Sequence, residues 1–199
     1  ATSVHNDLPE PTQAQIEAGN YKKGHIKVHG LDIAVENPRG SERRGTDPDG
    51  NEWSHNMSDH YGYIKRTTGA DQEHIDTYVG KNPESENVFI VDQIDQGSGG
   101  FDEHKVMYGY PSEEAATEAY LANYSKGWKG LGKVTAVSKA TFDKWLESSD
   151  RKTKPFADYA MVQKEQAKFD RDVKEVKPEN LTEAQKVAYD AVSTMLKIL

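Results

Sequence analysis

Cysteine is absent from this 199-residue sequence, and no apolar run in it is long enough to cross a membrane. The lack of cysteine excludes disulfide bonds, thiolate zinc sites and thiol catalysis, and it fits a reducing compartment. The first residues do not have the pattern of a signal peptide. We therefore expect a soluble, cytoplasmic protein that does not bind membranes.

Positive charge is in the minority, because 33 acidic residues outnumber 25 lysines and arginines and give a net charge of −8. This balance counts against non-specific binding to nucleic acid. An acidic protein can still bind phosphate groups through divalent cations, because each cation reverses the local field. The mean hydropathy of −0.87 is low. Three tryptophans and ten tyrosines nevertheless indicate a compact core rather than disorder.

Alternation of apolar and polar residues predicts strands in the first 110 residues, and a helical period follows them. A turn at 47–50 is expected to close a hairpin onto Trp53, and a glycine-rich turn at 96–100 precedes a last strand of this series. Ser112 and Ser138 have the position of helix caps, on either side of a further strand at 133–137. The other predicted strands are 25–29, 31–36, 61–65, 75–79, 88–94 and 105–110.

Strands followed by helices predict an α+β fold, namely a small, mostly antiparallel, OB-like barrel with two helices packed outside it. The C-terminal residues are charged and helical over 156–173. Thr182 and Gln185 have the spacing of a capping box that opens a last helix. We expect an N-terminal arm at 1–22, with a helical turn at 12–18, a barrel domain at 23–155 and a helical extension at 156–199.

Three carboxylates, Asp71, Glu73 and Asp76, follow one another at i, i+2 and i+5 between a glycine-containing turn and a strand. Around such a turn they can converge on one point. Oxygen ligands of this kind suit magnesium or manganese. If they converge, their mutual repulsion should destabilise the metal-free fold, so that Asp76→Asn would leave it at least as stable. The alternative is a solvated acidic loop.

These acids follow a Tyr61-Gly62-Tyr63-Ile64 segment, and the combination resembles the family I soluble inorganic pyrophosphatases, whose pattern is Tyr-Gly-Tyr-Ile and then Asp-Gly-Asp-Pro-x-Asp. The resemblance implies that the three acids hold the metals and carry the catalysis, with the middle acid as general base. It also implies that Tyr61 contacts a phosphate.

The chain departs from the pattern at Gln72, Glu73 and His74. A glutamate reaches one methylene further than an aspartate, which changes how a nucleophile is positioned.

Further blocks in the same order support the resemblance and extend the implied site. Glu36 matches an acid near the site. A second acidic cluster that binds metal is matched by Asp95 and by either Asp102 or Glu103, and the lysine that follows it is matched by Lys105. Among the basic residues, a planar guanidinium can grip phosphate with two hydrogen bonds, which makes Arg43 the first choice for a substrate contact. Lys126, after Tyr124, matches a phosphate-binding lysine.

For each of these residues, a purely structural role is the alternative to a role in the site. Lys105 beside acids can be a surface ion pair of little value. Arg43 can belong to a solvated basic turn, and Tyr124 can be core packing. The histidines, of which His25 and His29 share a strand face, lack the paired helical spacing of a zinc site.

Segments 24–30, 47–50 and 102–105 place the chain nearer to a divergent branch, the pyrophosphatase-like domains of large phage and mobile-element proteins. The implied activity is Mg²⁺-dependent (or Mn²⁺-dependent) hydrolysis of inorganic pyrophosphate to phosphate by metal-activated water. The alternatives are hydrolysis of another phosphoanhydride such as a nucleotide, or an inactive module that serves as a virion or interaction domain. Expected partners are pyrophosphate, phosphate and other domains of a larger protein, in the host cytoplasm or a virion.

Overall fold

The computed structural model describes residues 12, 14–15, 22–46, 50–83, 85–125, 127–150, 153–175 and 182–198. The predicted helical turn at 12–18 and the tip of the turn at 47–50 fall mostly outside these residues. In chain order the elements are β1 (Gly24–Val28), β2 (Leu31–Asn37), β3 (Glu42–Thr46), β4 (Glu52–Asn56), β5 (His60–Ile64), β6 (Asp76–Val79), β7 (Val88–Ile94), β8 (Phe101–Tyr108), α2 (Glu113–Leu121), β9 (Leu131–Val137), α3 (Lys139–Glu147), α4 (Phe156–Glu175) and α5 (Glu183–Ile198).

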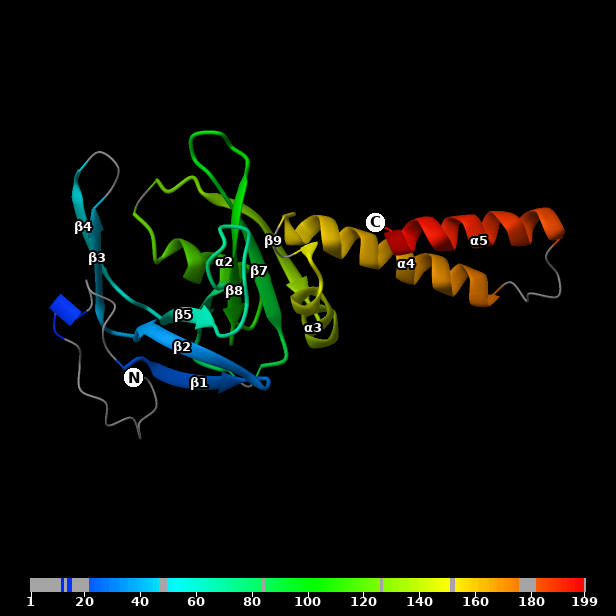
Figure 1. Ribbon diagram of the computed structural model, residues 1–199. Coiled ribbons are helices and arrows are strands. Elements are labelled where there is room, and N and C mark those ends of the chain that lie inside the picture. Colours follow the sequence, from blue (N-terminus) through cyan, green and yellow to red (C-terminus); the bar gives the residue numbers. More distant parts are fainter. Residues whose placement is uncertain are drawn as a thin grey trace. The chain divides into compact units, whose positions relative to one another are not determined.

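Seven strands form one sheet in the order β1-β2-β5-β6-β8-β7-β9, while β3 and β4 pair with each other as a separate hairpin (Figure 1). All neighbours in the large sheet are antiparallel except β6 and β8, which run parallel. The predicted mixed α+β fold with a mostly antiparallel sheet is confirmed. Between the described strands no pairing joins β1 to β9, so closure into a barrel stays a prediction.

Strand β8 begins at Phe101, four residues before the predicted start. The preceding turn is tight, since the Asp95 amide donates to the Gly100 carbonyl at 2.9 Å and the Gly99 amide donates to the Asp95 carbonyl at 2.8 Å. Asp102 and Glu103 therefore lie on a strand rather than in a turn. The hairpin predicted around the turn at 47–50 is present, since β3 and β4 pair antiparallel with Gly45 opposite Trp53, although the sequence of β3 has no apolar alternation.

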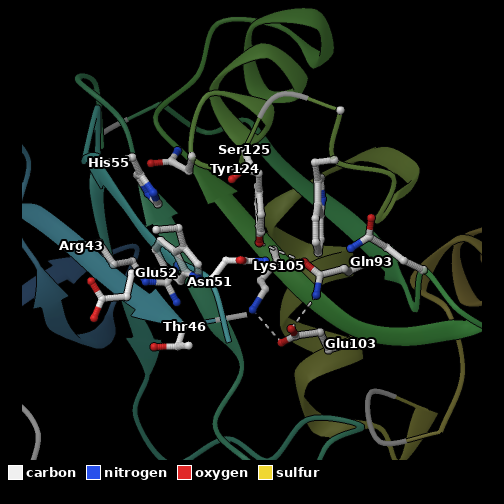
Figure 2. A pocket seen from close by; sticks show the side chains of 15 residues that line it. Arg43, Thr46, Asn51, Glu52, His55, Gln93, Glu103, Lys105, Tyr124 and Ser125 are labelled. Carbon is white, nitrogen blue, oxygen red and sulfur yellow. Dashed lines mark hydrogen bonds and ion pairs between the residues drawn. The ribbon is translucent and has the colours of Figure 1, made fainter. Parts of the chain in front are cut away.

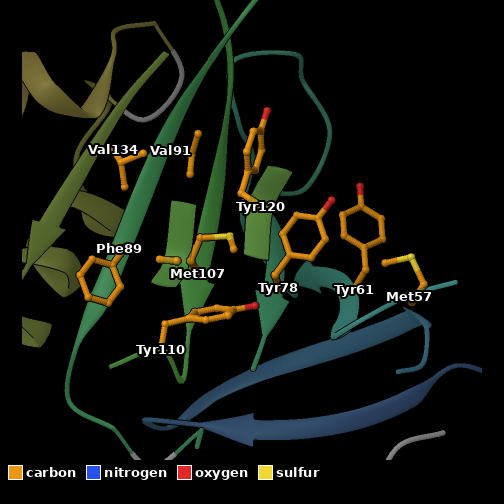
Figure 3. Packing of buried hydrophobic residues seen from close by; sticks show 10 residues of the cluster. Met57, Tyr61, Tyr78, Phe89, Val91, Met107, Tyr110, Tyr120 and Val134 are labelled. Carbon is orange, nitrogen blue, oxygen red and sulfur yellow. The ribbon is translucent and has the colours of Figure 1, made fainter. Parts of the chain in front are cut away.

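The main core lies on one face of the sheet and is rich in tyrosine and methionine (Figure 3). Burial of such side chains contributes roughly 1.5–3 kcal/mol each before the loss of conformational entropy is counted. Helix α2 covers this face with Ala116 and Tyr120. The cluster consists of Met57, Tyr61, Tyr78, Phe89, Val91, Met107, Tyr110, Ala116, Tyr120 and Val134.

Helix α3 packs against side chains that alternate along β8 with those of the main core. His104 lies 4.8 Å from the Trp145 ring, and Tyr108 lies 5.9 Å from Phe142, both in edge contacts. Met107 belongs to the main core. Because side chains alternate along a strand, Lys105 and Glu103 share the face of Met107.

The predicted helix caps are confirmed. Ser112 Oγ accepts a hydrogen bond from the Ala115 amide at 3.2 Å, and Ser138 Oγ accepts one from the Thr141 amide at 3.3 Å. Thr182 and Gln185 form the reciprocal capping box, with the Thr182 amide donating to Gln185 Oε1 at 2.9 Å. Each cap satisfies amides that have no partner within the helix.

The chain divides into two compact units, Ala1–Phe156 and Ala157–Leu199. The division of the first unit into an arm and a barrel domain, and the start of the extension at residue 156, remain our proposal. Within the described part, no helix is both long and apolar enough to span a membrane.

Gly62, at the centre of the Tyr-Gly-Tyr segment, lies directly against strand β2. A Cβ at this position would come within 1.9 Å of the Ala34 carbonyl oxygen and 2.9 Å of Val35 Cα. These atoms are backbone and cannot rotate away. We expect Gly62→Ala to destabilise the protein by roughly 3 kcal/mol, the upper end for overpacking, measured by urea unfolding.

The matched control is Gly97→Ala, because a Cβ at Gly97 meets nothing closer than Asp95 Oδ1 at 3.5 Å. That variant should unfold at nearly the wild-type urea concentration. Equal midpoints for both variants would show that β2 can yield and that Gly62 has no packing role.

Candidate functional site

A buried lysine joins two acidic side chains at the centre of the sheet. Asp76 on β6 and Lys105 on β8 are direct partners in the parallel pairing. Lys105 Nζ donates to Asp76 Oδ2 at 2.6 Å and to Glu103 Oε2 at 2.7 Å. Burial alone would lower the pKa of Lys105, but its interactions with Tyr61, Asp76 and Glu103 outweigh burial and raise that pKa well above its usual value. The ammonium therefore stays charged.

Tyr61 completes this group from the neighbouring strand β5. Its hydroxyl donates a hydrogen bond to Asp76 Oδ2. Burial is the main cause that raises the pKa of Tyr61 well above 10.0, so the phenol stays protonated and remains a donor. The Arg43 guanidinium, from β3, lies over the Tyr61 ring at 4.5 Å from its centroid. Its N–H groups have no hydrogen-bond partner among the residues described, which leaves them available to a ligand.

Gln93, which the sequence analysis did not single out, connects the acids to α2. Its Nε2 donates to Asp102 Oδ2 at 3.2 Å and to Glu103 Oε1 at 2.8 Å. Its Oε1 accepts hydrogen bonds from the hydroxyls of Tyr120 at 2.8 Å and Tyr124 at 3.0 Å. The signal for it in the sequence is a polar pair, Asp92 and Gln93, near the end of a strand whose other residues are apolar.

The charge around Glu103 shows that acids from separate segments converge. Burial is the largest cause that raises the pKa of Glu103 above 4.5, against the opposing effect of Lys105, and the charges of Asp76 and Asp71 raise it further. The charges of Asp71 and Asp76 thus both act on Glu103.

The loop that carries Asp71 and Glu73 keeps a conformation that suits glycine. Gln72, which stands where the family pattern has glycine, has a φ of 71°, in the left-handed region that non-glycine residues disfavour. Asp71 Oδ1 accepts a hydrogen bond from the Glu73 amide at 3.0 Å. The backbone at Gln72 therefore has a conformation that glycine adopts without steric cost.

A smaller cavity of about 380 Å³ opens beside Asp76. Glu36 and Glu73 line it together with Asp76. Lys23 Nζ pairs with Glu36 Oε1 at 2.6 Å. The Glu73 carboxylate has no hydrogen-bond partner within the described residues.

Among the predicted site residues that the structure describes, Asp95 has no bond to Lys105 or Gln93. The Asp95 carboxylate caps the hairpin turn, where its Oδ1 accepts hydrogen bonds from Ser98 N and Oγ, each at 2.8 Å. Asp95 does not line the smaller cavity beside Asp76 or the larger cavity described next. Lys126 lies outside the described residues.

The larger cavity, of about 690 Å³, lies between the β3–β4 hairpin and the end of α2 (Figure 2). Arg43 and His55 stand on its hairpin side, and Tyr124 and Gln93 stand opposite. Lys105 and Glu103 lie between the two sides. The cavity therefore joins the buried ion pairs to the surface.

The site fits magnesium in the type of its donors. Its acids supply carboxylate oxygens, which Mg²⁺ prefers, and the placement of Lys105 between two of them shows that they hold positive charge. Within the described ranges, no three acidic or histidine side chains form a complete metal-binding group. Mg²⁺ does not need one, because it commonly binds through one or two carboxylates, waters and substrate phosphates.

Comparison with known proteins gives two findings. The sequence pattern described as Inorganic Pyrophosphatase matches residues 13–147, more than half of the chain. Among solved structures, an inorganic pyrophosphatase from Coxiella burnetii is similar with 14% sequence identity and a TM-score of 0.33, over 58% of this chain and 89% of that chain. No curated protein matches.

Proposed function

Because the chain belongs to the inorganic pyrophosphatase family, we propose that it hydrolyses inorganic pyrophosphate to two phosphates with Mg²⁺ or Mn²⁺. The observation that carries the proposal is the cluster of Asp76, Glu103 and Lys105 beneath the cavity that also contains Arg43. Closure of the sheet into an OB-like barrel and membership of the phage-associated branch are parts of the same proposal.

The basic residues are suited to bind the substrate. A lysine ammonium has three donors, and Lys105 uses two of them on Asp76 and Glu103, so that one remains for a phosphate oxygen. The planar Arg43 guanidinium lies over the Tyr61 ring and can donate two hydrogen bonds to a phosphate. Positive charge held in place by a buried network stabilises the charge that develops on the leaving phosphate.

The acidic residues would hold the metal and accept the proton. Asp71, Asp76, Asp102 and Glu103 are the proposed ligands, and Gln93 orients the last two. Magnesium, when bound, makes water more acidic and neutralises phosphate charge. Glu73, whose carboxylate has no hydrogen-bond partner among the described residues, would take a proton from the attacking water. The water oxygen bonds to one phosphorus, and the bridging P–O bond breaks.

The test is phosphate release from pyrophosphate by the purified protein, with Mg²⁺, with Mn²⁺ and with EDTA. We expect turnover of about 1 s⁻¹ or faster with metal, loss of activity in EDTA, and recovery when Mg²⁺ is restored. Release no faster than that of metal without protein would overturn the proposal. The chain would then be an inactive module with a pyrophosphatase-like fold.

A further inference from the structure

The larger cavity has two aromatic walls that pyrophosphate does not require. On β4, the rings of Trp53 and His55 stack with centroids 5.5 Å apart and an angle of 16°. On the opposite side, Tyr124 and Trp128 stack at 4.4 Å and 11°. All four residues line the cavity. Aromatic rings on both sides of the cavity offer flat apolar surface to a planar ligand.

Two glycines hold the tryptophan rings in position. A Cβ at Gly45 would come within 2.3 Å of the Trp53 ring, and a Cβ at Gly130 would come within 2.2 Å of the Trp128 ring. Each indole therefore lies closely over a backbone that has no side chain. Trp53 belongs to the two-stranded hairpin and not to the buried cluster of the main sheet. Its fixed ring thus has no part in that core.

The cavity walls also contain hydrogen-bonding atoms whose capacity is unused. Asn123, which is 1% exposed, lines the cavity, and its Oδ1 has no partner among the described residues. The same holds for Nε2 of His55. Buried polar atoms without partners are unfavourable, so they indicate a polar ligand or water. Burial, with the nearby charge of Arg43, lowers the pKa of His55, which keeps its ring neutral.

The size of the cavity agrees with a ligand larger than pyrophosphate. Its volume of about 690 Å³ lies within the range of roughly 300–1,000 Å³ that holds drug-sized ligands. Arg43 lies between the ion pairs and the aromatic wall of the hairpin, since its guanidinium is 4.5 Å from the centroid of the Tyr61 ring and 5.6 Å from that of the Trp53 ring. Phosphate-binding and ring-binding groups are therefore neighbours in one cavity.

We propose that this cavity binds a nucleoside triphosphate, with its base against the aromatic walls and its phosphates at Arg43 and Lys105. The inference rests on the proposed function, because the same acids would serve hydrolysis. The oxygen of water bonds to the terminal phosphorus, and the bond from that phosphorus to the bridging oxygen breaks. The bridging oxygen leaves with the nucleoside diphosphate, and one proton passes to solvent. No oxidant or reductant takes part.

The experiment compares ATP with tripolyphosphate, which has the same phosphoanhydride bonds but no ring. With Mg²⁺ and the full chain, we expect kcat/KM for ATP to exceed that for tripolyphosphate by about tenfold, since stacking of a base on an aromatic side chain is typically worth that factor or more. Titration calorimetry should show the same preference in Kd. Equal values for the two compounds in both measurements overturn the inference.

Trp53→Leu keeps an apolar side chain but removes the aromatic face, so the ATP-to-tripolyphosphate ratio should fall about tenfold. Tyr189→Leu is the control, because it removes a half-buried ring from α5 instead. An unchanged ratio in folded Trp53→Leu overturns the inference. If that variant does not fold, Trp128→Leu and the wild-type comparison decide.

The two proposals fail separately. Tighter binding of ATP than of tripolyphosphate by a protein that hydrolyses nothing overturns the proposed function and supports the nucleotide site. Rapid hydrolysis of pyrophosphate without any preference for ATP overturns only the nucleotide site.

Discussion

Asp76→Asn is expected to lower pyrophosphate hydrolysis by more than about 100-fold. Mutation of groups that only support metal ligands already costs roughly 10–100-fold, and the proposed role of Asp76 is that of a ligand. In Asp76→Asn the side-chain shape is kept while its charge is lost. The measurement is kcat/KM at saturating Mg²⁺.

The stability of the same variant is a second readout. From the sequence alone, removal of one acid from a repelling cluster should leave the metal-free protein at least as stable. The structure reverses this expectation, because Asp76 accepts hydrogen bonds from Lys105 and Tyr61. Loss of hydrogen bonds to a charged group costs roughly 1.5–3 kcal/mol, so the metal-free variant should melt at a lower temperature.

Added Mg²⁺ should then stabilise Asp76→Asn less than it stabilises the wild type, since a ligand stabilises the folded state in proportion to its binding. Asp32→Asn is the matched control. Asp32 is also paired with a lysine, Lys65, at 3.4 Å, but it lines neither cavity near the site. An Mg²⁺-dependent shift in Asp76→Asn equal to that of wild type would remove Asp76 from the metal site.

Lys105→Met should lower both the stability of the metal-free protein and the rate of hydrolysis. The substitution leaves Asp76 and Glu103 close together without their shared cation, and breaking a buried ion pair by removal of one partner costs roughly 3–5 kcal/mol. Both carboxylates are partly exposed, so we expect about 3 kcal/mol in urea unfolding without metal. Hydrolysis should fall on the order of 100-fold or more, as it does when one fixed donor to a developing charge is lost.

Magnesium distinguishes this variant from a merely unstable one. A divalent cation can replace the missing ammonium between the two carboxylates, so Mg²⁺ should stabilise Lys105→Met more than wild type. Lys65→Met, which removes a half-exposed pair, should cost less than about 1 kcal/mol and leave hydrolysis unchanged. Equal Mg²⁺ shifts in Lys105→Met and wild type would contradict a metal between Asp76 and Glu103.

Local structure could be predicted from the sequence because it depends on residues that are neighbours along the chain. Alternation located most strands, and the caps at Ser112, Ser138 and Thr182 follow from side chains that bond amides three residues away. The order of motifs also predicted the family. The β3–β4 hairpin was predicted from its turn residues and not from alternation, because its strands are polar.

The composition of the site was decided by the pairing of distant strands. Asp76 and Lys105 meet because β6 and β8 run parallel side by side, although 29 residues separate them in the chain. Because β8 begins at Phe101, Glu103 lies on the strand and on the same face as Lys105. Asp95 lies before the strand, and its carboxylate bonds Ser98 in the turn. Spacing alone does not distinguish these outcomes, because it does not specify the strand order.

The aromatic cavity could not be predicted for a related reason. Trp53 on the β3–β4 hairpin and Trp128 after α2 belong to separate elements, and only the tertiary structure brings both to one cavity with Arg43 and Lys105. In the sequence each tryptophan is an isolated apolar residue near glycines. The sequence by itself thus determined the elements and the family, and the packing of the hairpin and α2 around the sheet decided which side chains face a ligand.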